Sequence, residues 1–331
     1  MPLLAALLLL APAAAAQAKP TAVVALGDSS ISGESAGNYE PGTDQPGNFC
    51  HRSRDALIHA TRIPGIDATL NLACSGAATR HLLIGGARQN GEPPQSEKLR
   101  SAAATHDIKL VVVGIGTNDD PHFAQVATTC VARFVLRRPH CRNALRPSWP
   151  ERLAAMAPKV ARALDDVEAV MREADPAAAW QPVLVSYWSP VPAPPLRYSG
   201  YFSKLVNGCP LHDADMRWAH DVAVPQLNTT LRGVAGAKGW RFLDLSRSMD
   251  GREICARGIA HRDEWVTGLS YDPWSAGWFS FDAVRQSLHV NAAGHAELGA
   301  CVTEFFAMAD AEAACLRGTD GHLHALAPRD Q

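Results

Sequence analysis

Residues Thr21 to Leu26 read Thr-Ala-Val-Val-Ala-Leu, and Pro20 and Gly27 bound this short run. A run of this length and composition is typical of a β-strand that is buried on both faces of a sheet. Similar runs recur along the chain at Ala68–Ala73, Ile108–Ile115, Pro182–Tyr187 and Trp240–Leu245. The chain therefore predicts a series of buried strands.

Helical patterns separate these strands. The predicted helices are Arg52–Thr61, Glu97–Thr105, Trp149–Asp175, Leu211–Val234 and Ala292–Ala309. Strands that alternate with helices indicate a mostly parallel sheet covered by helices on both faces. The sequence therefore predicts an α/β protein with three α/β/α layers and a mostly parallel central sheet.

The amino-acid composition and the net charge exclude some classes of protein. The 331 residues include 31 Lys+Arg and 33 Asp+Glu, a formal net charge of −2, and 47% are hydrophobic. This apolar content is enough for a large core and excludes extensive disorder. The balanced charge argues against a nucleic-acid partner, because no basic block could neutralise the phosphates.

The N-terminus predicts export. Leu3–Ala16 is almost entirely Leu and Ala, is too short to span a bilayer, and leads into Ala16-Gln17-Ala18. Small residues such as Ala16 and Ala18 are typical of the positions that signal peptidase recognises. We therefore expect a signal peptide over residues 1–18, cleaved after Ala18, and export to the periplasm or the medium. The alternative is a buried or anchoring N-terminal helix. No later segment is apolar enough to span a membrane, so we expect no stable membrane anchor.

The cysteines agree with export. The eight are Cys50, Cys74, Cys130, Cys141, Cys209, Cys255, Cys301 and Cys315, and none forms a CxxC pair or a metal-ligand pattern. An even number in an exported chain indicates disulfides, and eight cysteines allow 105 connectivities. Nearest-neighbour pairing (50–74, 130–141, 209–255, 301–315) is the simplest; reduced, buried cysteines are the alternative.

Two polar turns follow predicted strands. Gly27-Asp28-Ser29-Ser30 follows the first strand, and Gly116-Thr117-Asn118-Asp119 follows the third. Ligands of parallel sheets bind at the carboxyl ends of the strands, where Ser29 could act as a nucleophile and the Asn118 amide could donate to an oxyanion. Taken alone, each turn is more typical of a helix N-cap.

Gly76 and His289 are two further candidate site residues. Gly76, in Cys74-Ser75-Gly76-Ala77, follows the second strand, and a glycine there lets a backbone N–H approach a substrate oxygen. His289 precedes the last predicted helix, at a place from which a base could reach the same sheet edge. A lone histidine is more often structural.

Together, Ser29, Gly76, Asn118 and His289 resemble the four dispersed residues of the SGNH hydrolases, also called GDSL esterases and lipases. Ser32-Gly33-Glu34, Tyr39 and Cys50-His51-Arg52-Ser53 are similar to the secreted bacterial lipase and esterase branch, which also carries sequential local disulfides. The resemblance extends from Thr21 to about Cys315. It implies a single hydrolase domain over residues 19–315. Residues 316–331 are polar with scattered Gly and Pro, so we expect them to form a frayed tail.

The resemblance implies acyl transfer. Ser29 would attack an ester carbonyl with His289 as base, and Ser29 N–H, Gly76 N–H and the Asn118 amide would form the oxyanion hole. No metal or cofactor is implied. We expect a monomer that acts on a small-molecule or lipid ester.

One position departs from the family. Most relatives carry Asp three residues before the histidine, where this chain has Gln286. The Gln286 backbone carbonyl could orient the imidazole instead, and Asp282 is the fallback. The loops Gly33–Phe49 and Ser189–Pro195 could border the site.

Other functions remain open to different degrees. A carbohydrate acetyl esterase would use the same catalytic residues, and a non-catalytic exported α/β binding module would explain the loss of the Asp. A dinucleotide-binding dehydrogenase is disfavoured because Gly114-Ile115-Gly116 is followed by Asp119 where a third glycine is needed. A metallohydrolase is disfavoured because the chain has no HExxH pattern.

Overall fold

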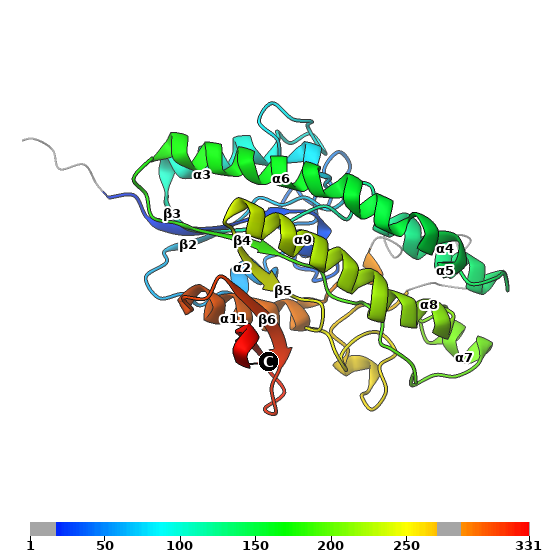
Figure 1. Cartoon of the computed structure of the whole chain (residues 1–331). Helices are drawn as coiled ribbons and strands as arrows, with labels where there is room; N and C mark the ends of the chain where they lie inside the picture. Colours follow the sequence, from blue (N-terminus) through cyan, green and yellow to red (C-terminus); the bar gives the residue numbers. More distant parts are fainter. Residues whose placement is uncertain (1–17, 270–285, 331) are drawn as a thin grey trace, which may run out of the picture.

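The computed structural model describes residues 18–269 and 286–330, whose strands form one seven-stranded sheet (Figure 1). The strands are β1 (Thr21–Gly27), β2 (Ala68–Asn71), β3 (Asp107–Gly114), β4 (Gln181–Val185), β5 (Arg241–Asp244), β6 (Glu312–Arg317) and β7 (Leu323–Leu326). Their order is β2-β1-β3-β4-β5-β6-β7, and only the β6–β7 pair is antiparallel. The predicted mostly parallel sheet is confirmed.

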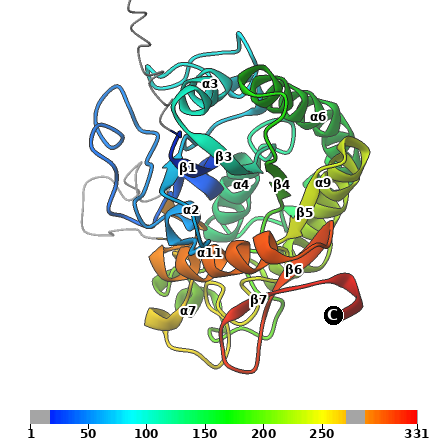
Figure 2. The same ribbon diagram turned by 90° about the vertical axis from the view of Figure 1, so that its left-hand side faces the viewer.

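Helices cover both faces of this sheet. The α-helices of the described residues are α1 (Ser29–Ser32), α2 (Leu57–Ala60), α3 (Gln95–Thr105), α4 (Phe123–Val135), α5 (Arg142–Leu145), α6 (Trp149–Ala174), α7 (Tyr201–Val206), α8 (Asp213–Trp218), α9 (Val224–Lys238) and α11 (Ala292–Ala307). Figure 2 shows α3, α6 and α9 on one face and α2 and α11 on the other. This is the expected three-layer α/β/α fold.

Short helical turns complete the secondary structure: η1 (Thr79–His81), η2 (Arg146–Ser148), η4 (His261–Asp263) and η5 (Pro328–Asp330) are 3-10 helices, and η3 (Ala219–Ala223) is a π-helical turn. Figure 1 shows α4, α5, α7 and α8 beyond the carboxyl ends of the strands. This is the end of the sheet at which a ligand site is expected.

The end of β1 depends on a glycine. Gly27 has a φ of 146°, and a Cβ at this position would lie 2.0 Å from the carbonyl oxygen of Gly114 on the neighbouring strand β3. Only glycine fits such a close approach of two backbones. The chain therefore leaves the sheet at Gly27 and enters α1 one residue after Asp28.

Two helix predictions were incomplete. The helix expected over Arg52–Thr61 is confined to α2, because Arg52 and Ser53 form extended backbone contacts, Arg52 with Glu40 and Ser53 with Ser32. Helix α4 was not predicted. Its residues follow a loop closed by the Phe123 N–H donating to the Thr117 carbonyl.

The expectation of a frayed tail over residues 316–331 was wrong. After β6 the chain turns and returns as β7, whose first residue, Leu323, is buried. The carboxylates of Glu297 and Glu304 on α11 accept the N–H groups of Leu323 and Ala325 at 3.0 and 2.8 Å. Side chains on α11 thus occupy edge N–H groups that would otherwise be exposed, which the polar composition of the tail did not reveal.

All four nearest-neighbour disulfides are confirmed: Cys50–Cys74, Cys130–Cys141, Cys209–Cys255 and Cys301–Cys315. The signal peptide prediction falls almost wholly outside the described residues. Within residues 18–269 and 286–330, no helix combines the length and the hydropathy needed to cross a membrane.

Candidate active site

The side chains of Ser29 and His289 meet at the carboxyl end of the sheet. Ser29 is the first residue of α1, and His289 lies in the turn before α11. Nε2 of His289 is 2.8 Å from Oγ of Ser29, although the two residues are 260 positions apart in the chain. At this distance the hydroxyl can donate its proton to the imidazole nitrogen.

A backbone carbonyl holds the other ring nitrogen. Nδ1 of His289 lies 3.1 Å from the carbonyl oxygen of Ser287, which accepts its proton. The prediction that the Gln286 carbonyl does this was wrong. That carbonyl accepts the backbone N–H of His289 at 3.4 Å, in a turn that places Leu288 at a φ of 65°.

The hydrogen bond from Nδ1 of His289 to the Ser287 carbonyl determines the tautomer of the imidazole. An acceptor at Nδ1 keeps the proton there and leaves the lone pair of Nε2 facing Ser29. A carbonyl can thus replace the orienting function of a carboxylate, though it carries no full negative charge. The fallback residue, Asp282, lies outside the described residues.

Asp28 joins the ends of three strands beneath Ser29. Its fully buried carboxylate accepts hydrogen bonds from the N–H and Oγ of Ser30, from Oγ1 of Thr117 at 3.0 Å and from Oη of Tyr187 at 2.6 Å. Burial raises the pKa of Asp28, and these hydrogen bonds oppose the shift. Because Thr117 follows β3 and Tyr187 follows β4, the network positions Ser29 relative to the Asn118 loop.

Asn118 is oriented by a hydrogen bond from its side chain. Its Nδ2 donates to the carbonyl of Ala77 at 2.9 Å, so the second proton on Nδ2 remains for another acceptor. The next residue, Asp119, accepts the N–H and Oγ1–H of Thr79 at 3.0 and 2.8 Å. These contacts connect the Asn118 loop to the loop that carries Gly76.

Gly76 and Ser29 provide backbone donors. Gly76 has a φ of 75°, which a residue with a side chain rarely adopts. In the described part of the chain, neither the Gly76 N–H nor the Ser29 N–H has a hydrogen-bond acceptor. Both can therefore donate to a ligand.

Glu34 and His51 form a buried pair next to Gly76. The Glu34 carboxylate is fully buried, bonds to Nδ1 of His51 at 2.8 Å and accepts the hydroxyl proton of Ser75. Burial alone would raise the pKa of Glu34, but the contacts with His51, Ser75 and the nearby His289 lower it. Glu34 is therefore ionised at neutral pH.

Sequence reasoning did not assign roles to these supporting residues. Glu34 and His51 entered only as part of a family segment, and Tyr187 only as the end of a predicted strand. Their signal is weak in the sequence because each partner is distant along the chain: Tyr187 is 159 positions from Asp28, and Ser75 is 41 from Glu34.

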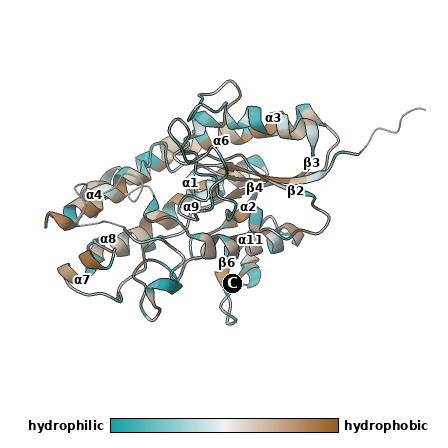
Figure 3. Ribbon diagram, turned by 180° about the vertical axis from the view of Figure 1, so that it is seen from behind, coloured by the Kyte–Doolittle hydropathy of each residue, from teal (hydrophilic) through white to brown (hydrophobic). Residues whose placement is uncertain are grey.

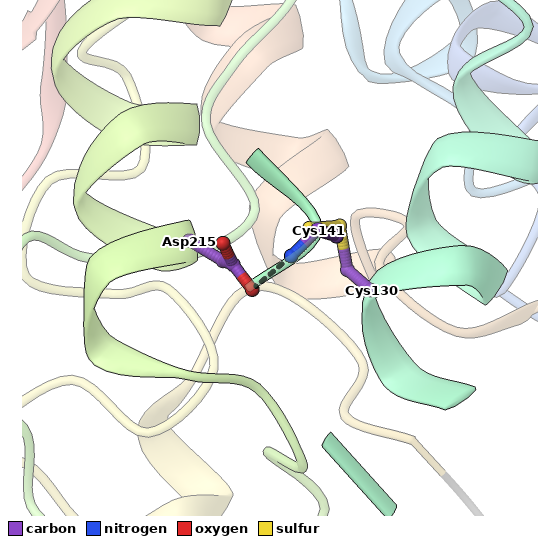
Figure 4. A group of neighbouring side chains, drawn as sticks. All are labelled: Cys130, Cys141 and Asp215. Carbon is purple, nitrogen blue, oxygen red and sulfur yellow. Dashed lines mark hydrogen bonds between the residues drawn. A yellow bond between two sulfur atoms is a disulfide. The ribbon is translucent and has the colours of Figure 1, made fainter. Parts of the chain in front are cut away.

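Three groups of metal-ligand side chains occur within the described residues: Cys130, Cys141 and Asp215; His140, His212 and Asp215; and His220, Asp250 and Glu253. In the first group, the two sulfurs form a disulfide, so neither is a thiolate (Figure 4). Asp215 accepts the N–H groups of Cys141 and Arg142, both at 3.0 Å, one on each oxygen. The disulfide and both oxygens of Asp215 are therefore accounted for by protein contacts, whereas Nδ1 of His140 is buried and has no hydrogen-bond partner among the described residues.

Residues 25–297 match the GDSL-like Lipase/Acylhydrolase family. The chain is also 30% identical over 271 residues to Lipase 1 of Streptomyces coelicolor, a match that covers 80% of this chain and 86% of that relative. The residues matched by the family, 25–297, include the Ser29, Gly76 and Asn118 loops as well as His289.

Two crystal structures are similar to this fold. An extracellular lipase from Streptomyces rimosus matches with a TM-score of 0.52 and 24% identity, over 83% of this chain and 94% of that one. Phospholipase A1 from Streptomyces albidoflavus NA297 matches with a TM-score of 0.54 and 25% identity, over 84% and 95%. The similarity therefore extends over nearly the full length of both solved chains.

Proposed function

Because the chain belongs to the GDSL-like lipase/acylhydrolase family and is a carboxylic ester hydrolase, we propose that it works as a serine esterase or lipase with Ser29 as nucleophile and His289 as base. The observation that carries this proposal is the 2.8 Å contact between Nε2 of His289 and Oγ of Ser29. A decayed site would have no reason to keep this contact together with two backbone donors that lack acceptors.

In the proposed reaction, His289 takes the proton from Oγ of Ser29 while Oγ attacks the ester carbonyl. The Nδ1–H bond to the Ser287 carbonyl holds the imidazolium that forms. Ser29 N–H, Gly76 N–H and Asn118 Nδ2 donate to the tetrahedral oxyanion, where the negative charge develops. His289 then protonates the leaving alcohol, and water repeats the sequence on the acyl-enzyme.

Exposed apolar side chains beyond the carboxyl ends of the strands favour a substrate ester with an apolar acyl group. Figure 3 shows hydrophobic residues on α4 and α7, beyond the carboxyl ends of the strands. Leu136, Phe202 and Val206 from this region are each at least 66% exposed. Val206 also lines a hollow of about 690 Å³ whose wall includes Thr267, which donates its N–H to the His289 carbonyl.

We also propose that the protein is exported. Four disulfides and no free cysteine are present in the described chain, and such bonds persist in oxidising compartments. Together with the signal-like residues 1–18, they support a periplasmic or extracellular location.

The test is hydrolysis of p-nitrophenyl esters of increasing acyl length, from acetate to palmitate, by the wild type and the Ser29→Ala variant. We expect turnover by the wild type and a loss of at least about 1,000-fold in the variant. The control is Ser101→Ala, an exposed serine on α3, which should leave the rate unchanged.

The chain-length profile separates the substrate classes. A preference for medium or long acyl chains supports the lipase assignment, whereas activity confined to acetate, and to acetylated polysaccharide, would favour the carbohydrate esterase. No turnover, combined with no labelling of Ser29 by a fluorophosphonate, would contradict the proposed catalytic role.

A further inference from the structure

Three side chains from two separate segments converge in a cluster that shares no residue with the candidate active site. His220 lies in the π-helical turn η3, between α8 and α9, and Asp250 and Glu253 lie in the loop that follows β5. One donor atom from each residue lies within 4.8 Å of the other two. π-Helical turns are rare and often occur at functional sites, so the chain conformation at His220 is itself unusual.

Two carboxylate oxygens in this cluster are buried and accept no hydrogen bond from the described residues, although one of them, Oδ1 of Asp250, forms an ion pair with Nε2 of His220 at 3.5 Å. Glu253 is only 2% exposed, and neither its Oε2 nor the Oδ1 of Asp250 accepts a hydrogen bond from the described residues. Two guanidinium groups bind Asp250 at other atoms. Arg247 binds the other oxygen of Asp250, Oδ2, at 2.8 Å, and Arg317 binds the backbone carbonyl of Asp250. A buried acceptor without a donor is costly unless something else occupies the space.

The imidazole is oriented as a metal ligand would be. Nδ1 of His220 donates to Oδ1 of Asp221 at 2.7 Å. Its Nε2 therefore faces the cluster, 3.5 Å from Oδ1 of Asp250 and 3.9 Å from Oε1 of Glu253. Metal-binding histidines commonly donate their other ring N–H to a carboxylate in this way, since that bond fixes the tautomer and the ring direction.

We propose that His220, Asp250 and Glu253 bind a divalent transition metal ion of the Zn²⁺ class. One imidazole nitrogen and two carboxylate oxygens suit such an ion better than Ca²⁺ or Mg²⁺, which prefer oxygen ligands alone. Ligands at about 2.0–2.2 Å from an ion lie about 3–3.5 Å apart, so small side-chain rotations would close the cluster around it. His220 and Asp250 are partly exposed, which leaves room for water as a further ligand.

Protonation of His220 would compete with binding of a metal ion to this cluster. Asp250 and Asp221 raise the pKa of His220 to about 9, and burial raises the pKa of Glu253 to about 7. A protonated imidazole would pair with the carboxylates at 3.5 and 3.9 Å, longer than a good hydrogen bond, and would still leave Oε2 of Glu253 without a donor. An ion bound by both carboxylates satisfies more of these atoms.

The site is structural and does not depend on the proposed function. The Arg252 carbonyl accepts the N–H of Trp265 at 2.8 Å, and the Trp265 carbonyl accepts the N–H of Asn291 at 2.8 Å. An ion at Asp250 and Glu253 would therefore order the segment that supports the His289 turn. Its loss should appear in stability, whatever the enzyme hydrolyses.

The test measures Zn²⁺ binding by the full-length protein. After removal of metals with a chelator, the wild type should bind one equivalent of Zn²⁺ that Glu253→Gln and His220→Gln do not bind, measured by calorimetry and by elemental analysis after gel filtration. Zn²⁺ should also raise the melting temperature of the wild type by several degrees and leave that of Glu253→Gln unchanged. Ca²⁺ and Mg²⁺ should bind more weakly.

The matched control is His212→Gln, a histidine in the group whose Asp215 is already occupied by backbone N–H groups. This variant should retain the Zn²⁺ equivalent. Melting of each variant in chelator reports whether it folds, and Glu253→Gln should fold because it removes a buried charge. No saturable equivalent in the wild type up to about 1 mM Zn²⁺, or equal binding by folded Glu253→Gln, would overturn the proposal and leave an ion-paired histidine.

Discussion

At the scale of single residues, the candidate active site is defined by how each side chain is oriented. Asn118 lies after a buried strand, where a helix cap is the ordinary function, but its amide donates to the Ala77 carbonyl. This bond directs Nδ2 toward the loop of Gly76 and leaves one proton free. The amide is therefore oriented before any ligand arrives, as the proposed oxyanion-hole role requires.

We predict that Asn118→Ala lowers kcat by about 100- to 1,000-fold and changes KM little, because the lost donor acts on charge that develops in the transition state. Steady-state kinetics with a soluble p-nitrophenyl ester would measure both constants.

The control for this prediction is Asn143→Ala, an exposed asparagine on α5. It should behave as the wild type. A rise in KM at constant kcat for Asn118→Ala would instead assign the amide to ground-state binding.

At the scale of elements, one ion-paired cluster joins the loop before α2 to the start of α3. Glu92 accepts two hydrogen bonds from the guanidinium of Arg52, at 2.7 and 2.8 Å, and one from Nζ of Lys98. Burial alone raises the pKa of Glu92, but Arg52 and Lys98 outweigh it and lower the pKa to about 2. The segment held in this way carries Cys50 and the buried His51.

The lowered pKa of Glu92 determines how the free energy of unfolding depends on pH. The pKa of Glu92 in the folded state lies below its ordinary value of 4.5, so its stabilising effect is complete above pH 4.5 and is lost as the pH falls toward 2. We predict that Glu92→Gln costs about 2–3 kcal/mol of unfolding free energy at pH 7, and that this difference shrinks steadily below about pH 4.5. Denaturant unfolding at several pH values measures it.

Glu173→Gln is the matched control, because Glu173 forms a single exposed ion pair with Arg100. Its effect should stay within about 0.5 kcal/mol at every pH. A Glu92→Gln difference that does not vary with pH would show that packing, and not charge, accounts for the contribution.

At the scale of the whole molecule, the four disulfides connect elements and loops that are separate along the chain. Cys301–Cys315 ties α11 to β6, and Cys209–Cys255 ties the segment after α7 to the loop after β5. The pairs close loops of different length: 46 positions for Cys209–Cys255 and 11 for Cys130–Cys141.

The number of residues in each closed loop predicts how much each disulfide contributes to the free energy of unfolding. A disulfide stabilises mainly by restricting the unfolded chain, so removing Cys209–Cys255 should cost about 4 kcal/mol and removing Cys130–Cys141 about 3 kcal/mol. The comparison uses the two double cysteine-to-alanine variants and their urea unfolding curves. Equal losses, or a larger loss for the shorter loop, would contradict this account and indicate that native contacts around the bridges dominate.

Much of this protein could be predicted from local sequence. Five of the strands, the mostly parallel sheet and the four nearest-neighbour disulfides follow from apolar runs, alternation and cysteine order. The expectation of burial was wrong for β2, in which only Asn71 is buried. The residues proposed for catalysis follow from three short blocks after strands, a fourth before the last helix, and one family resemblance. These features are local because a strand's burial and a turn's glycine are determined within a few residues.

The tertiary structure alone decided which groups support these residues. The carbonyl at Nδ1 of His289 belongs to Ser287 because of a single left-handed residue in the turn, and the β6–β7 hairpin depends on carboxylates from α11. His220 meets Asp250 and Glu253 across a whole helix and strand. Such contacts depend on loop geometry and on partners distant in the chain, and a single sequence carries no local signal for either.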